Sequence, residues 1–287
     1  MKKAGIVLLI GRPNVGKSTL LNTLVGQKVS ITSPKPQTTR FPIRAVLEDE
    51  RGQLIFIDTP GIFKKAEDIL SREVNRKTLA TLDEEFDVVV YMVDPTRARS
   101  FEEGRVLGIV RKINKPVILV FNKIDLETKH MAEYAFIQDE VTATYKISAL
   151  KDKHIKPFIE DVFSRVDREY PLVDMTDSVT PALNMNSRLF LQEIIREKVY
   201  LFTREEVPYK VGVAVEEIKE RDNGSLYIKA VVYTVDKRYR AMLVGRQGRM
   251  VKEIGMAARK ELERSTNKKV FLDLRIEANH HQQEILG

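Results

Sequence analysis

Eight residues near the beginning of the chain require a strand, a tight loop and a helix in succession. They are Gly11-Arg12-Pro13-Asn14-Val15-Gly16-Lys17-Ser18, and they fit the pattern G-x-x-x-x-G-K-[ST]. An apolar run, Ile6–Ile10, precedes them, and a helical pattern over Lys17–Val25 follows. Glycines let backbone N–H groups turn inward around phosphate oxygens, and the helix N-terminus adds a favourable partial charge. This context favours a phosphate-binding loop over a tight turn without a ligand.

Two side chains at the end of this loop are candidates for binding a triphosphate and its metal. We expect Lys17 to reach the β and γ phosphates and Ser18 to bind Mg²⁺. A second candidate segment, Asp58-Thr59-Pro60-Gly61, follows the apolar run Leu54–Ile57. Asp58 is expected to hold Mg²⁺ through water. The Gly61 N–H is expected to meet the γ-phosphate, so the segment after it would respond to that phosphate.

The base of the nucleotide is predicted from Asn122-Lys123-Ile124-Asp125, which ends the apolar run Val117–Phe121. The Asp125 carboxylate only accepts hydrogen bonds, and guanine offers it two adjacent donors. Adenine would leave that carboxylate unpaired, so such a site discriminates strongly, by ~10⁴ or more. We expect Ser148 and Ala149 to support the base, with the Ala149 N–H facing guanine O6. The predicted ligand is therefore GTP or GDP.

The remaining catalytic candidates are less specific. Thr39 is assigned to Mg²⁺ in the GTP state with Thr38 as the alternative, and an ordinary polar loop over Thr32–Arg40 stays open. Ile62, which follows Gly61 in the candidate nucleotide segment, cannot hydrogen-bond water, so we expect slow basal hydrolysis. Asn14 is a candidate K⁺ ligand near the β and γ phosphates, and a role in loop shape alone has equal weight.

The order of elements predicts an α/β domain with a mostly parallel sheet and helices on both faces. Five apolar runs rich in Val and Ile alternate with helical stretches, as expected of strands buried on both faces. The runs are Ile6–Ile10, Leu54–Ile57, Val88–Val93, Val117–Phe121 and Tyr145–Ile147, with an edge strand near Arg44–Glu48. The helical stretches are Lys17–Val25, Leu70–Leu82, Glu102–Ile113, Met131–Thr142 and Ile155–Arg165.

The pattern changes after a segment with Pro171 and Pro181, so we predict domains at 1–170 and 184–287 joined by a linker at 171–183. The second domain is α+β. Its predicted helices lie at Leu189–Val199, Arg240–Leu243 and from Arg249. Its strands carry the alternating residues Val211 to Val215, Leu226 to Ala230 and Val270 to Ile276, with a hairpin turn at Asp222-Asn223-Gly224.

The net charge is +7, and much of it lies in the second domain between Lys237 and Lys269. A basic cluster there indicates an anionic partner, either nucleic acid or an acidic membrane surface, unless it is an ordinary solvated helix face. The loop Gly245-Arg246-Gln247-Gly248, with Arg249 and Lys252 after it, lies inside this cluster. Two glycines permit close approach to phosphates, so this loop is the candidate RNA site; a helix–turn–helix packing element is the alternative.

Composition sets a few limits. The chain contains no cysteine, which excludes disulfides and Cys-ligated zinc. No apolar run is long enough to span a membrane, and the apolar run after Met1 is too short for a secretory signal. We expect a cytoplasmic protein, and no feature points to an obligate protein partner.

Taken together, the motifs resemble those of the Era family of bacterial GTPases. The first-half motifs and Thr38-Thr39-Arg40 carry this resemblance, and the second half adds Leu201–Tyr209 and Val244–Gly248 of an Era-type KH domain. The resemblance implies GTP hydrolysis and a type II KH domain that binds RNA near the 3′ end of small-subunit ribosomal RNA. It further implies a role in assembly of the 30S subunit and peripheral contact with the inner membrane. The competing hypotheses are an RNA-binding module with a structural nucleotide site, and a GTPase that acts on a membrane or protein partner.

Overall fold

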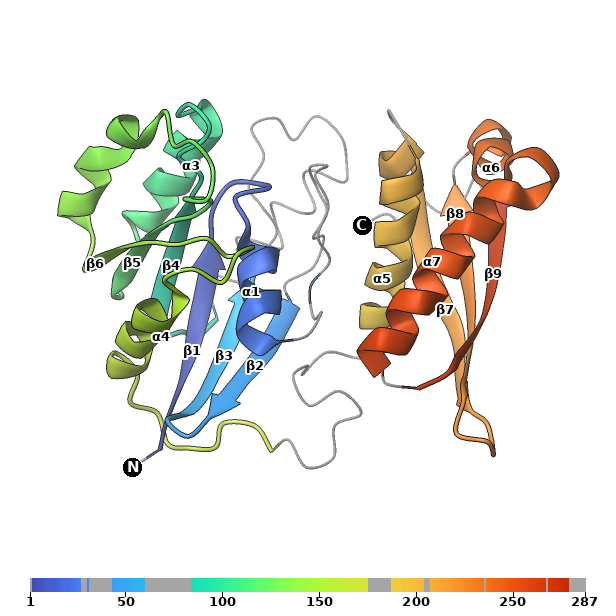
Figure 1. Cartoon of the computed structure of the whole chain (residues 1–287), viewed down its shortest axis with the longest axis horizontal. Helices are drawn as coiled ribbons and strands as arrows, with labels where there is room; N and C mark the ends of the chain where they lie inside the picture. Colours follow the sequence, from blue (N-terminus) through green and yellow to red (C-terminus); the bar gives the residue numbers. More distant parts are fainter. Residues whose placement is uncertain are drawn as a thin grey trace. The chain divides into compact units, whose positions relative to one another are not determined.

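A computed structural model describes residues 2–26, 30, 43–59, 84–174, 187–203, 207–234, 236–266 and 268–278. The chain forms two compact units, Met1–Asn184 and Met185–Gly287 (Figure 1). Several predictions fall outside the described residues: the loop at 32–40, the segment at 60–62 and the helix at 70–82. None of the helices in the described parts of the chain is both long and apolar enough to cross a bilayer.

The first unit is built on a six-stranded sheet in the order β2-β3-β1-β4-β5-β6. The strands are β1 (Lys3–Ile10), β2 (Ile43–Asp49), β3 (Gly52–Asp58), β4 (Val88–Val93), β5 (Val117–Phe121) and β6 (Ala143–Lys146). All neighbours pair in parallel except β2, which is antiparallel to β3. The predicted parallel sheet and its edge strand are therefore confirmed.

Helices connect these strands at α1 (Lys17–Val25), α3 (Phe101–Val110) and α4 (Ile155–Ser164). The segment predicted as helical over Met131–Thr142 is a 3₁₀-helix, η1 (Met131–Glu140). Its two buried residues, Tyr134 and Ile137, are three positions apart. That spacing puts both on one face of a helix with three residues per turn, which explains why the tighter helix packs well here.

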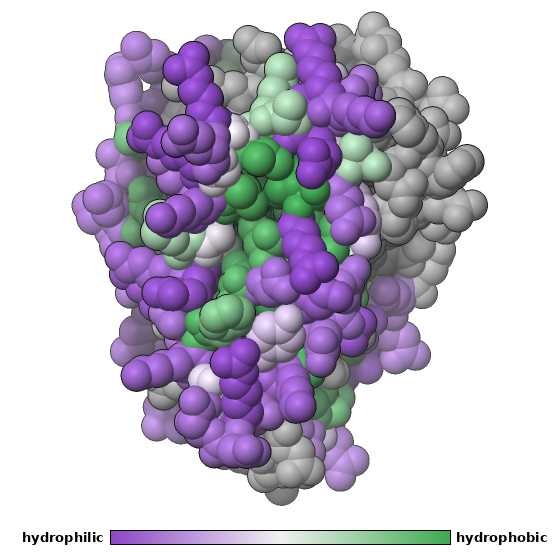
Figure 2. Space-filling view, turned by 90° about the vertical axis from the view of Figure 1, so that its right-hand side faces the viewer, coloured by the Kyte–Doolittle hydropathy of each residue, from purple (hydrophilic) through white to green (hydrophobic). Residues whose placement is uncertain are grey.

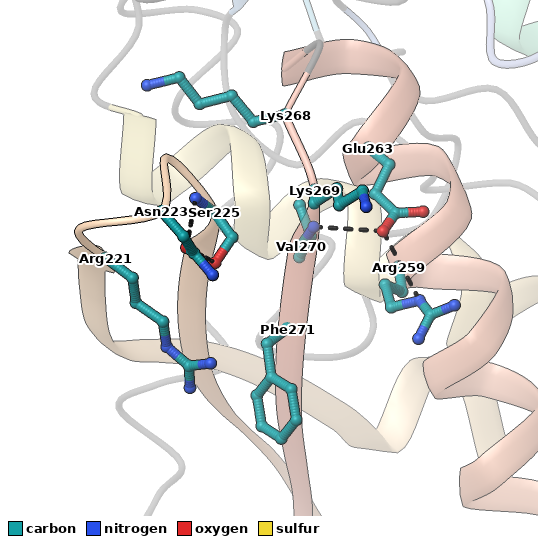
Figure 3. A pocket seen from close by; sticks show the side chains of 9 residues that line it. All are labelled: Arg221, Asn223, Ser225, Arg259, Glu263, Lys268, Lys269, Val270 and Phe271. Carbon is teal, nitrogen blue, oxygen red and sulfur yellow. Dashed lines mark hydrogen bonds and ion pairs between the residues drawn. The ribbon is translucent and has the colours of Figure 1, made fainter.

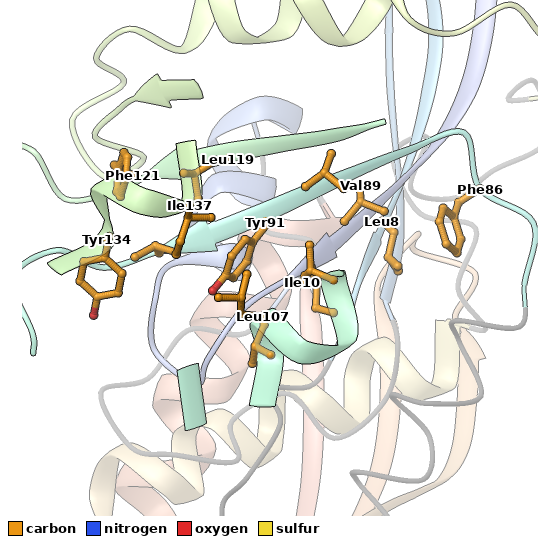
Figure 4. Packing of buried hydrophobic residues seen from close by; sticks show 14 of the residues in the cluster. Leu8, Ile10, Phe86, Val89, Tyr91, Leu107, Leu119, Phe121, Tyr134 and Ile137 are labelled. Carbon is orange, nitrogen blue, oxygen red and sulfur yellow. The ribbon is translucent and has the colours of Figure 1, made fainter. Parts of the chain in front are cut away.

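An apolar core fills the space between the sheet and the elements α3 and η1 (Figure 4). Every residue of β4 and β5 is buried, as parallel strands covered on both faces require. Tyr91, Leu119 and Tyr134 lie in this cluster together with Leu107 from α3. The core therefore supports the strands at whose ends the nucleotide motifs lie.

The second unit has a three-stranded sheet in the order β7-β8-β9. Its elements are α5 (Ser187–Phe202), η2 (Val207–Lys210), β7 (Val211–Glu220), β8 (Leu226–Thr234), α6 (Lys237–Val244), η3 (Arg246–Gly248), α7 (Arg249–Thr266) and β9 (Val270–Ala278). β8 pairs antiparallel with β7 and parallel with β9. Helices α5 and α7 pack on each other and on the sheet, which gives the predicted α+β architecture.

The substitution Leu119→Ala tests the core of the first unit. Leu119 is fully buried on β5, so its truncation should lower the free energy of unfolding by about 2–5 kcal/mol. Native-state hydrogen exchange of β5 amides measures this loss within one unit of the chain. Leu126, which is 56% exposed, supplies the control: Leu126→Ala should stay within about 0.5 kcal/mol. Equal effects of the two substitutions would contradict the assigned core.

Candidate nucleotide site and nucleic-acid interface

The predicted nucleotide residues gather at the carboxyl ends of the parallel strands. The loop Gly11–Ser18 follows β1, Asp58 ends β3, Asn122 follows β5, and Ser148 comes shortly after β6. In an open parallel sheet this edge is where ligands bind. The structure thus brings together all the predicted residues that it describes; Thr39, Pro60, Gly61 and Ile62 lie outside the described residues.

The glycines of the loop are required by close contacts. A Cβ on Gly11 would lie 2.5 Å from the Met92 carbonyl oxygen, and one on Gly16 would lie 2.2 Å from Nδ2 of Asn122. Gly16 also has φ of 106°, a left-handed conformation that favours glycine. The loop can therefore adopt this shape only with glycine at both positions.

Lys17 is folded back over the loop. Its Nζ donates to the carbonyl oxygens of Gly11 at 2.9 Å and Arg12 at 3.2 Å, and burial lowers the pKa of this amine. Burial outweighs the attraction of the nearby Asp58 and Glu103 carboxylates, so the ammonium is only partly compensated. An anionic ligand placed in the loop would supply the missing charge, which suits Lys17 to phosphate binding.

Asp58 and Ser18 form the candidate metal site. Ser18 Oγ donates to Asp58 Oδ2 at 2.7 Å, and Ser30 Oγ donates to the same oxygen at 3.0 Å. The other oxygen, Oδ1, is buried and has no hydrogen-bond partner among the described atoms. Burial raises the pKa of Asp58, although the nearby Lys17 ammonium opposes this shift. A buried carboxylate with one unused oxygen beside a hydroxyl fits Mg²⁺ and its water ligands.

Asn122 and Lys123 tie the phosphate loop to the base end of the site. Asn122 Nδ2 donates to the Val15 carbonyl at 2.8 Å, and its Oδ1 accepts the Ala149 N–H at 2.9 Å. Lys123 Nζ donates to the Asn14 carbonyl at 2.8 Å and pairs with Asp94 at 2.6 Å. Because the Ala149 N–H is used here, its assignment to guanine O6 stays a prediction.

Asp125 lies with Ser148 at the outer end of the same edge. The Ser148 hydroxyl donates to Asp125 Oδ1, which fixes one carboxylate oxygen. Ser148 is fully buried, and its main chain pairs with Lys153 in both directions. The carboxylate is therefore oriented before any base arrives, an arrangement suited to two adjacent donors such as those of guanine.

Sequence reasoning placed Arg12 with the nucleotide-binding residues, but its side chain is turned under the loop. Its Nε lies 2.8 Å from a carboxylate oxygen of Glu103 on α3, and its Nη1 donates to Ser100 Oγ at 2.8 Å. Tyr91 donates to Glu103 at 2.6 Å. Burial raises the pKa of Glu103, with Tyr91 and Arg12 opposing the shift. If Arg12 contacts a nucleotide, its backbone therefore does so, because the guanidinium is occupied by this network.

The candidate RNA loop joins α6 to α7. Gly245 has φ of 69° and ψ of 177°, and a Cβ there would lie 2.8 Å from that of Met250. Arg246 and Gln247 are exposed at the tip, with Gln247 at φ of 50°. Lys252 is exposed on the first turns of α7, whereas Arg249 pairs with Glu253 at 2.9 Å.

A hollow between α7 and β9 continues from this loop. Its floor is apolar and includes Gly255, Met256, Leu272 and Leu274. On the face of the second unit shown in Figure 2, an apolar strip runs between hydrophilic side chains. Such a strip can accept unpaired bases while the basic rim meets phosphates.

Comparisons with known proteins match both units of the chain. A protein-family model described as "50S ribosome-binding GTPase" matches residues 6–123, and one described as "KH domain" matches residues 206–281. The GTPase Era of Halothermothrix orenii is 40% identical over 98% of this chain and 96% of its own length. That of Carboxydothermus hydrogenoformans is 41% identical over 95% and 91%.

Two solved structures resemble the whole chain. Era in complex with MgGDPNP and nucleotides 1506–1542 of 16S ribosomal RNA has a TM-score of 0.89 and 35% identity, covering 100% of this chain and 98% of that one. A Tyr-to-Ala variant of Era from Aquifex aeolicus, bound to GDP·AlF4⁻, has a TM-score of 0.88 and 34% identity, covering 99% and 97%.

The parallel sheet with its nucleotide edge, followed by a KH domain, defines a GTPase that carries an RNA-binding module. Sequence identity of about 40% to two Era proteins, along nearly the full length of the chain, narrows this class to one family. The chain belongs to the Era family of GTPases, enzymes that hydrolyse GTP to GDP and phosphate.

The base-reading role of Asp125 can be tested by Asp125→Asn. The carboxamide replaces an acceptor with a donor, so GTP affinity should fall by at least about 100-fold as two charge-assisted hydrogen bonds are lost. Affinity for xanthosine triphosphate should rise, because its 2-oxo group accepts from the new amide. Equilibrium binding of both nucleotides measures this exchange. Unchanged GTP affinity with no gain for the xanthine nucleotide would show that Asp125 does not contact the base.

Proposed function

We propose that this chain is a GTP-driven switch that binds the 3′ region of small-subunit ribosomal RNA through its KH domain and assists assembly of the 30S subunit. The observation that carries the proposal is the exposed Gly245–Gly248 loop at the start of α7, beside an apolar hollow with a basic rim. An Era relative that is 35% identical over the whole chain was solved with nucleotides of 16S ribosomal RNA. We place the linker between the two units at 171–183.

The small subunit is the better target of the two that the comparisons suggest. The phrase "50S ribosome-binding" belongs to a family model that matches only residues 6–123, within the nucleotide unit. The 16S ribosomal RNA belongs to a structure that resembles both units. Because the RNA-binding loop lies in the second unit, the relative that includes this unit is the more informative one.

For hydrolysis we infer in-line attack of water on the γ-phosphate, with catalysis by positioning and charge neutralisation. Lys17 and the backbone N–H groups of the loop would hold the β and γ phosphates. Ser18, Asp58 and Thr39 would hold Mg²⁺, which supplies positive charge to the phosphate oxygens. Gly61 is assigned to the γ-phosphate. Ile62 has no group that orients water, so the basal reaction should be slow.

A monovalent cation site beside Asn14 is the remaining catalytic proposal. Asn14 has φ of 62°, and its carbonyl accepts from Lys123, so the loop is held firmly at this position. We propose that its side-chain oxygen contributes to a K⁺ site near the β and γ phosphates. A monovalent cation there would neutralise charge that Ile62 cannot.

Cellular location follows the proposed partner. We propose that the protein acts in the cytoplasm at the ribosome, with peripheral contact at the inner membrane as the family resemblance implies. The competing proposal is a GTPase whose basic helix meets anionic lipid. Binding of the protein to vesicles that contain an anionic lipid, compared with binding to RNA, separates the two.

Replacing Na⁺ by K⁺ should raise the basal rate of GTP hydrolysis, and Asn14→Ala should remove the difference between the two ions. Phosphate release with each chloride salt at equal ionic strength measures both. Asn114→Ala is the matched control, because Asn114 is exposed before β5, away from the nucleotide edge. An undiminished K⁺ response in Asn14→Ala would move the ion site elsewhere.

The double substitution Arg246→Asp and Gln247→Asp tests RNA binding. Both side chains are exposed, and aspartate tolerates the left-handed backbone at Gln247. RNA affinity should be abolished for every sequence, since phosphate contacts position the strand. Hydrolysis without RNA should remain nearly unchanged. Wild-type binding should weaken with salt, with a log–log slope of about −0.7 per phosphate neutralised.

The control makes the same charge change elsewhere. Asn114→Asp with Lys115→Asp alters two exposed neighbours in the first unit and should leave RNA affinity intact. RNA affinity over a salt series, circular dichroism and phosphate release are measured on the same samples. Wild-type affinity in a folded loop variant would show that the loop is structural.

A further inference from the structure

An exposed aromatic pair lies on the sheet of the second unit. Tyr227 on β8 and Phe271 on β9 are partners in the parallel ladder, and their rings stack with centroids 5.8 Å apart and planes 22° apart. Val270 and Ile276 on the same strand are buried, whereas Phe271 is 53% exposed. Because successive side chains of a strand point to opposite faces, Phe271 lies on the face opposite to that of Leu272, which lines the hollow beside α7.

The guanidinium of Arg221 lies over both aromatic rings. Its guanidinium carbon lies 5.2 Å from the Tyr227 ring centroid and 5.0 Å from that of Phe271. The β7–β8 turn fixes its backbone: the Arg221 N–H donates to Ser225 O at 2.9 Å, and the Gly224 N–H donates to Arg221 O at 2.8 Å. No carboxylate pairs with Arg221 in the described parts of the chain. We call these three residues the aromatic platform.

The surroundings of the platform are basic. A shallow hollow of about 690 Å³ is lined by Arg221, Arg259, Lys268 and Lys269 together with a single acidic residue, Glu263. Figure 3 shows Arg221 reaching from the hairpin on one side and Arg259 from α7 on the other, with Phe271 on the strand between them. Lys268 pairs with Glu220 at 2.8 Å, while Lys269 is exposed and has no ion pair among the described residues.

We propose that the aromatic platform is a second RNA contact, where an unpaired base stacks on Phe271 and Arg221 while Lys269 meets the adjoining phosphate. Base stacking on aromatic rings and guanidinium planes is a common mode of single-stranded RNA recognition. This inference rests on the proposed RNA binding and extends it. An aromatic pair that only stabilised the sheet would not need an arginine without a carboxylate partner over both rings.

The platform is separate from the Gly245–Gly248 loop. The loop precedes the first residue of α7, and the platform lies beyond its last turn, at the start of β9. An 18-residue helix spans about 27 Å. A KH loop clamps about four nucleotides, so the platform engages only RNA that extends past the clamp. Because a short RNA can bind only the loop and a longer RNA can bind both contacts, the two contacts can be tested separately.

The experiment compares a single-stranded RNA of about four nucleotides with one of about 16 nucleotides, on the full-length protein. Phe271→Leu keeps an apolar side chain but removes the ring, and Arg221→Lys keeps the charge but removes the plane. Each should weaken binding of the longer RNA by about 5-fold or more, which corresponds to one lost stacked base. Neither should change binding of the short RNA. Phe202→Leu is the matched control, at a phenylalanine on α5 that is 37% exposed.

A second readout reports the stack itself. A 2-aminopurine base scanned along the longer RNA should be quenched at one position by the wild-type protein and by Phe202→Leu, but not by Phe271→Leu. Unchanged affinity for the longer RNA, or equal loss for both lengths, would overturn the platform. If Phe271→Leu and Arg221→Lys lost binding to anionic vesicles but kept wild-type RNA affinity, the platform would be a lipid contact and the proposed RNA contact would be overturned. Failure of both RNAs to bind the wild-type protein would instead refute the proposed function.

Discussion

The side-chain amide of Asn122 joins the two ends of the nucleotide site. It donates to Val15 in the phosphate loop and accepts from Ala149 at the base end, so one side chain connects the two ends. This link explains why Gly16 must lack a Cβ, since that atom would occupy the space of the amide. Lys123 strengthens the same connection through Asn14 and Asp94. A nucleotide that binds here meets a preformed site, which limits the entropy lost on binding.

A buried charge network supports the loop from below. Arg12 and Glu103 are almost fully buried, and an ion pair of this kind costs desolvation that its attraction only offsets with good hydrogen bonds. Tyr91 and Ser100 supply such bonds. The network therefore ties the loop to α3. Loss of one partner would leave an unpaired buried charge beside the loop.

Most of the fold and the outline of the nucleotide site could be predicted from the sequence, because the strands are apolar and each motif follows a strand. Ser30 could not be predicted as part of the site, because it belongs to no motif and reaches Asp58 only in the folded chain. The ion pair of the Arg12 side chain with Glu103 could not be predicted either, since a pattern gives the position of a residue in a loop but not the direction of its side chain. The aromatic platform was missed for a related reason. Tyr227 and Phe271 are 44 positions apart, and only the β8–β9 register makes them neighbours.

The length of helix α7 determines how far apart the two proposed RNA contacts lie. Its 18 residues separate the Gly245–Gly248 loop at one end from the start of β9 at the other by a distance that the helical geometry fixes. A strand of RNA that touches both ends would be selected for its length between two contacts as well as for its bases. Insertion of one residue in the helix would add about 1.5 Å and rotate one end by a fraction of a turn. The number of residues in α7 therefore sets the distance between the two RNA contacts.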